Sequence, residues 1–221
     1  MGKWTQVAPE LNSQGKIRTL LEYNGKLYGA THAATGGRLF EWNDVDAWVQ
    51  VAPHLTEAAV PSLVVYDNKL YGGTDNTGRL YEWNGSNAWV EVAPQLNSQT
   101  TIDSLVVFNS KLYGGTASGG RLFEWNDSNS WVQVAPQLNS QASIWHMIVF
   151  NNKLYGGTSA GGRLFRWNGT DAWLEEAPQL NGQDIIYALA EYNDMLYGGT
   201  SGGGRLFEWH RGTGLIRINM V

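Results

Sequence analysis

The side chains best suited to bind a ligand occupy one position that differs among otherwise similar segments of the chain. At five corresponding places this position follows an aliphatic residue and holds Arg18, Pro61, Asp103, Trp145 and Tyr187. In one segment the next residue is His146. A guanidinium, a carboxylate, an imidazole and two aromatic rings could together hold a ligand by charge and by ring stacking. Alternatively, these positions differ because packing constrains them weakly.

A second set of polar residues recurs as Asn-Ser-Gln or Asn-Gly-Gln in the segments that follow an Ala-Pro pair. The set comprises Asn97, Gln99, Asn139, Gln141, Asn181 and Gln183. Amides beside aromatic rings can hold a neutral sugar through planar hydrogen bonds and stacking. The same amides can also bond backbone groups of their own loop. The sequence leaves both interpretations open.

Patterns that usually indicate catalysis or metal binding are weak here. Gly-x-Ser-x-Gly occurs at residues 157–161 and 199–203, but a nucleophile elbow needs a strand-to-helix turn, and we expect a hairpin there. The four histidines occupy unrelated positions and the chain has no cysteine. We therefore predict no catalytic residues, no metal site and no cofactor.

Composition narrows the classes of partner. The formal net charge of the 221-residue chain is −5, with both signs interspersed, which argues against nucleic acid as a partner. No run of 18 apolar residues occurs, so we expect no membrane span. The expected partner is a glycan or a protein.

One unit of about 42 residues organises the whole chain. Its Leu-Tyr-Gly phrase begins at Leu27, Leu70, Leu112, Leu154 and Leu196. Each unit reads as four short strands with Asn-, Asp- or Gly-rich turns between them, and lacks helical apolar spacing. Such a unit is typical of a propeller blade. The sequence thus predicts one all-β domain, a five-bladed β-propeller with four antiparallel strands per blade.

The predicted blades span residues 17–52, 60–93, 102–135, 144–177 and 186–209. The fifth blade lacks an outer strand in this scheme, and residues 4–8 repeat the outer-strand phrase. We expect this N-terminal strand to close the last blade and residues 212–221 to form a tail. The alternative gives that place to residues 215–219. We expect a monomer, and the strand left over offers an edge for dimers formed by strand exchange.

The unit resembles the kelch-type propeller repeat. The resemblance rests on Leu112-Tyr113-Gly114-Gly115, then Trp125, then Trp131 six residues later. The unit is shorter than kelch repeats of about 50 residues, and five blades are more similar to tachylectin-type lectins. Residues 89–130 and 131–172 share 27 of 42 residues, which indicates recent amplification or engineering.

Function follows only loosely from such a fold. We expect a non-catalytic module that recognises a glycan or a protein on one loop face. The alternative is a structural or designed scaffold without a natural ligand. An enzyme with its site at the channel mouth would need an acid–base pair, and none is close in sequence.

Overall fold

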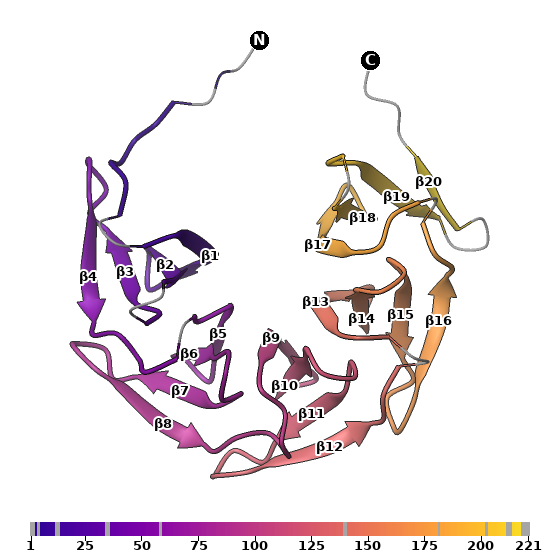
Figure 1. The fold of residues 1–221 in the computed structure, drawn as a ribbon, viewed down its shortest axis with the longest axis horizontal. Helices are drawn as coiled ribbons and strands as arrows, with labels where there is room; N and C mark the ends of the chain where they lie inside the picture. The colour runs from indigo at the N-terminus through magenta and orange to yellow at the C-terminus, as the bar shows by residue number, and fades with distance from the viewer. Residues whose placement is uncertain are drawn as a thin grey trace.

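The chain forms an all-β, five-bladed propeller, as predicted from the repeat (Figure 1). The computed structural model describes residues 3, 5–11, 14–33, 36–57, 59–138, 141–180, 182–201, 203–210 and 214–217. Within these ranges every element is a strand, and no helix long and apolar enough to cross a membrane is present. Each blade is one antiparallel sheet of four strands taken in chain order.

Equivalent strands occupy equivalent places in the five sheets. The innermost strands are β1 (Lys16–Tyr23), β5 (Ser62–Tyr66), β9 (Ile102–Phe108), β13 (Ile144–Phe150) and β17 (Ile186–Tyr192). The second strands are β2 (Lys26–His32), β6 (Lys69–Gly73), β10 (Lys111–Thr116), β14 (Lys153–Thr158) and β18 (Met195–Thr200). The third strands are β3 (Leu39–Trp42), β7 (Leu80–Trp83), β11 (Leu122–Trp125), β15 (Leu164–Trp167) and β19 (Leu206–His210). The outer strands are β4 (Trp48–Ala52), β8 (Trp89–Ala93), β12 (Trp131–Ala135), β16 (Trp173–Ala177) and β20 (Gly214–Arg217).

Two-residue turns join the first and second strands of each blade. In the first blade Asn24 and Gly25 have φ of 51° and 74°, and in the third Asn109 and Ser110 have φ of 49° and 59°. Positive φ at both central residues matches the right-handed twist of the strands that the turn connects. The turn residues therefore set each hairpin locally, as the sequence predicts.

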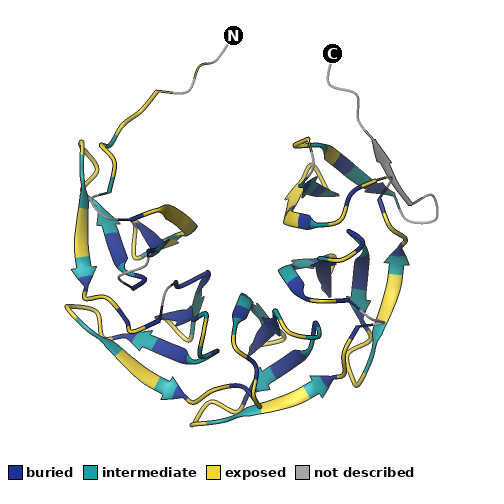
Figure 2. Cartoon of the chain, viewed as in Figure 1, coloured by how far each residue is buried: buried dark blue, intermediate teal, exposed yellow. Residues whose placement is uncertain are grey.

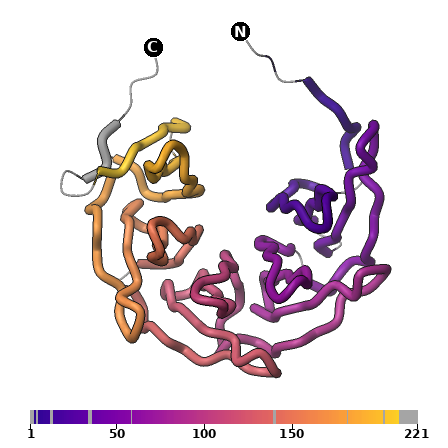
Figure 3. The backbone as a smooth tube through the Cα atoms, turned by 180° about the vertical axis from the view of Figure 1, so that it is seen from behind, coloured from indigo at the N-terminus to yellow at the C-terminus, as the bar shows by residue number. Residues whose placement is uncertain are grey.

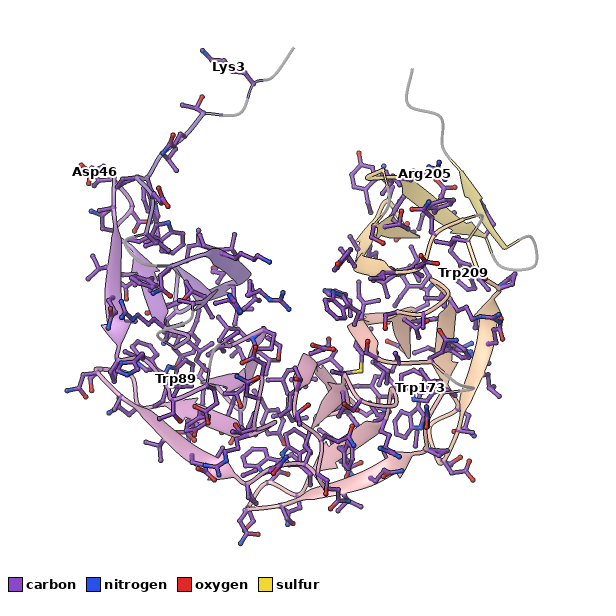
Figure 4. All side chains as sticks on the ribbon, viewed as in Figure 1. Lys3, Asp46, Trp89, Trp173, Arg205 and Trp209 are labelled. Carbon is purple, nitrogen blue, oxygen red and sulfur yellow. The ribbon has the colours of Figure 1, made fainter. Side chains whose placement is uncertain are left out.

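The apolar core lies between neighbouring sheets. Trp125 of β11 is 6 % exposed and packs against Tyr71 and Leu105 in one cluster. Trp209, which Figure 4 labels on β19, packs in the same way against Tyr155 of the preceding blade. The repeated tryptophans of the third strands thus join one blade to the next. In Figure 2 the buried residues follow these interfaces, while the outer strands β4, β8, β12 and β16 have exposed residues in the middle and a buried residue at the end.

The prediction that residues 4–8 complete the fifth blade is wrong. β20 pairs with β19 instead, matching Phe207 with Arg217 and His210 with Gly214. Residues 5–8 form no strand, and Trp4 lies outside the described residues. The five sheets form an open arc, with the first and last blades on either side of its opening (Figure 3).

Candidate functional site

The inner strands share a repeated irregularity at the positions where the blades differ most. In β1 the pairing with β2 skips Arg18, and in β9 the pairing with β10 skips Asp103. Trp145 in β13 and Tyr187 in β17 are skipped in the same way. Each of the four is thus the extra residue of a β-bulge, a device that redirects a side chain and often lies beside a functional site.

The second blade also has an unpaired residue at this position, but without a β-bulge. Its β5 begins at Ser62, so Pro61 precedes the paired strand. Proline has no N–H to donate to a strand ladder, and it is tolerated at strand starts and bulges. All five blades therefore place an unpaired residue at the same height of the inner strand.

These five residues line one cavity of about 520 Å³ at the centre of the arc. Its wall comes from all five inner strands, which face the central opening in Figure 1. A volume of this size suits a ligand of drug-like size or about one to two sugar rings. The structure therefore brings together the positions that sequence comparison of the blades singles out.

Three side chains from three different blades meet across the cavity. The Arg18 guanidinium lies 5.8 Å from the centre of the Trp145 ring. Trp145 and Tyr187 are edge to face, with ring centres 5.3 Å apart. Tyr187 remains 46 % exposed. The cavity thus offers a stacked cation and an accessible aromatic face, which together suit a polar ring.

Asp103 supplies the acidic group of the site. Burial raises the pKa of its carboxyl to about 7, while the nearby Arg18 lowers it and Asp75 raises it. One carboxylate oxygen, Oδ2, is buried without a hydrogen-bond partner within the described residues. A buried oxygen without a partner is costly, and a hydroxyl or amine of a ligand would satisfy it.

His146 combines an inter-blade contact with its place in the cavity wall. The backbone N–H of Leu189 donates to His146 Nδ1 at 3.3 Å, and burial lowers the pKa of this imidazole. The equivalent Ser104 hydroxyl accepts from the N–H of Met147 at 2.9 Å. This position therefore links adjacent inner strands, and His146 both positions β17 and lines the cavity.

The recurrent glutamines are buried, and none of them lines the central cavity. The Thr158 hydroxyl donates to Gln141 Oε1 at 2.7 Å, and Thr200 donates to Gln183 Oε1 at 2.6 Å. With the Gln99 amide oriented so that its oxygen accepts from Arg121, its nitrogen donates to the Thr116 hydroxyl at 3.0 Å. All three glutamines are at most 5 % exposed. The structure thus favours the interpretation in which these amides hold their own loop, here against the Gly-Gly-Thr phrase.

The asparagines of the Asn-Ser-Gln and Asn-Gly-Gln motifs differ from the buried glutamines. Asn97 is exposed in a turn with φ of 28°. Asn139 and Asn181 lie outside the described residues. A sugar-binding role for these asparagines stays a prediction.

The Gly-x-Ser-x-Gly segment at 157–161 lies in the connection from β14 to β15, between two strands. Its Ser159 hydroxyl pairs with the Ser143 hydroxyl at 2.5 Å. This is not the strand-to-helix geometry of a nucleophile elbow. Among the described residues, no group of three or more histidine, aspartate or glutamate side chains could hold a metal ion.

Comparison with known proteins gives the fold and little more. No protein-family model matches the chain, and no curated protein matches it. A solved structure of virginiamycin B lyase from Staphylococcus aureus, a catalytically inactive form with quinupristin, is 11 % identical with a TM-score of 0.76, covering 95 % of this chain and 71 % of that chain. The WD40 propeller domain of Doa1 is 19 % identical with a TM-score of 0.68, covering 96 % and 71 %.

A designed protein is also similar. The computationally designed Ika8 protein is 20 % identical with a TM-score of 0.59, and the alignment covers 91 % of this chain and 60 % of that chain. These likenesses show a repeat β-propeller fold, and the fold does not by itself determine function. The kelch-like resemblance is not confirmed by them.

Proposed function

We propose that this protein is a non-catalytic binding module that holds a glycan in the central cavity. One observation carries the proposal. In a chain of closely similar blades, five unpaired inner-strand positions direct five different residues to one cavity. Positions with a packing role repeat from blade to blade, whereas these five differ and converge on one cavity, which supports a single ligand site.

The chemistry of the wall favours a sugar over an apolar ligand. The accessible Tyr187 ring offers a stacking face, and Arg18 offers several N–H donors. The partnerless Asp103 oxygen offers an acceptor for a hydroxyl group. A sugar ring carries both an apolar face and hydroxyl groups, so it can use all three. A protein that inserts a polar side chain into the cavity is the other kind of ligand that this wall could bind.

A glycan array followed by a paired-variant experiment tests the proposal. For any glycan that binds, Trp145→Ala with Tyr187→Ala should weaken binding about ten- to hundredfold, because aromatic anchors at the centre of a site contribute most of its affinity. The matched control is Val90→Ala with Val132→Ala, which truncates two exposed residues on outer strands. Unchanged affinity in the first variant would refute a site in the cavity. Loss on Asn97→Ala with Asn139→Ala instead would favour repeated loop sites.

A scaffold without a natural ligand is the second candidate. The close similarity of the blades and the designed propeller among similar structures support it. If the array and a protein pull-down both find no ligand, this second function is the better explanation.

A further inference from the structure

Two positively charged side chains line the central cavity without a carboxylate partner. Elsewhere in the blades, basic residues commonly pair with glutamates, as Arg79 does with Glu91 at 2.9 Å. Lys16 and Arg18 both line the cavity, yet neither forms an ion pair with any of the residues that the structure describes. The cavity wall therefore presents two cations whose charge no direct contact neutralises.

An aromatic ring positions the Arg18 guanidinium inside the cavity. Arg18 belongs to β1 in the first blade, and the Trp145 ring, 5.8 Å away, belongs to β13 in the fourth blade. The contact thus joins strands from two blades that are not neighbours. A guanidinium that lies over an aromatic face keeps the N–H groups of its planar edge available. Arg18 can therefore donate hydrogen bonds to a ligand while Trp145 holds it in place.

Two carboxyl groups lie near Arg18 without pairing with it. Burial raises the pKa of Asp103 to about 7, so below pH 7 this carboxyl is mainly uncharged. Asp75 does not line the cavity, and its Oδ1 accepts from the backbone N–H of Ala59 at 2.7 Å. Burial lowers the pKa of the remaining titratable base in the wall, His146, which keeps its imidazole neutral. At neutral pH the lining thus carries a net positive charge.

We propose that the ligand of the central cavity is an acidic sugar, whose carboxylate binds Arg18 and Lys16 while its ring stacks on Tyr187. This inference rests on the proposed glycan site and narrows it to one chemical class. A planar guanidinium can bond both oxygens of a carboxylate, whereas a neutral sugar offers it only hydroxyl and ring oxygens.

The remaining groups of the wall fit the same ligand. The buried Oδ2 of Asp103 has no hydrogen-bond partner among the described residues, and a ring hydroxyl of the sugar would supply one. The cavity volume of about 520 Å³ admits one or two sugar rings. A hexuronic acid, which carries its carboxylate directly on the ring, is the simplest sugar with this combination of groups.

Calorimetric titration with matched sugars tests the inference. The pairs are methyl glucuronide with methyl glucoside, methyl galacturonide with methyl galactoside, and sialyllactose with lactose. In at least one pair the acidic member should bind about tenfold or more tightly, because charge-assisted hydrogen bonds are roughly twice as strong as neutral ones. Added salt should weaken the acidic member more than the neutral one.

Substitution of the two arginines assigns the preference to its residue. Arg18→Gln should reduce the acidic preference to about twofold or less, because an amide cannot supply the charge of the guanidinium. Arg79→Gln is the matched control, since it removes the same charge from a residue outside the cavity lining. It should keep the full preference. Circular dichroism verifies that both variants fold.

The possible failures of this inference and of the proposed function are distinguishable. Equal binding of acidic and neutral sugars, lost on Trp145→Ala with Tyr187→Ala, would overturn the acidic preference and leave a glycan site in the cavity. An acidic preference that Arg18→Gln retains would also overturn the inference, because the carboxylate would then bind elsewhere. If no sugar of any pair binds, the inference and the glycan site fail together.

Discussion

Replacing Asp103 by asparagine should make the protein more stable, and the gain should depend on pH. In the folded chain the pKa of Asp103 rises from its ordinary 3.8 to about 7, chiefly through burial. Below pH 4 the carboxyl is protonated in both the folded and unfolded chains, so the substitution should change the free energy of unfolding little. Between pH 4 and pH 7 the unfolded chain loses this proton while the folded chain keeps it. The wild type therefore loses stability as the pH rises.

The magnitude follows from the pKa difference. A tenfold change in an equilibrium corresponds to about 1.4 kcal/mol. The free energy of unfolding of Asp103→Asn should therefore exceed that of the wild type by about 4 kcal/mol at pH 8. Urea unfolding followed by tryptophan fluorescence at pH 4, 6 and 8 measures the difference. Asp44→Asn, at an exposed turn, is the matched control and should show no such trend. A difference between Asp103→Asn and wild type that stays constant from pH 4 to pH 8 would refute the reasoning.

Two further predictions concern the blade interfaces and the chain ends. Trp125→Ala should lower the free energy of unfolding by about 3–5 kcal/mol, as for a large aromatic deleted from a core. Trp42→Ala, at a half-buried tryptophan of the first blade, should lower the free energy of unfolding by less than half as much in the same urea unfolding experiment. Deleting residues 211–221 removes the partner of β19 and should lower the melting temperature by about 5 °C or more. Deleting residues 1–9 should lower it by less than about 2 °C, and calorimetry showing the reverse order would contradict the placement of β20.

Part of the candidate site could be predicted from the sequence. The divergence at Arg18, Asp103, Trp145 and Tyr187 stands out because the surrounding residues repeat. The β-bulges that redirect these side chains are harder to predict from the sequence. Pro61 at the equivalent position is the one hint, since proline cannot pair in a ladder there.

The glutamines bond their own loops because they are buried, and their burial depends on how the blades pack. Gln141 and an exposed sugar-binding glutamine would look alike in sequence. Only the packed loop places its amide against Thr158 and removes it from solvent. The partnerless oxygen of Asp103 is likewise a consequence of how five strands surround one cavity.

The sequence by itself determined the strands, their turns and the number of blades. These features are local, because turn residues with positive φ and short apolar runs specify each hairpin without distant contacts. Two segments with strand-like sequences could supply the outer strand of the last blade, and only the tertiary structure shows which one does. Residues 214–217 follow β19 within a few residues, whereas residues 4–8 would have to cross the opening of the arc. The shorter connection costs less chain entropy, so the neighbouring segment pairs and the arc remains open.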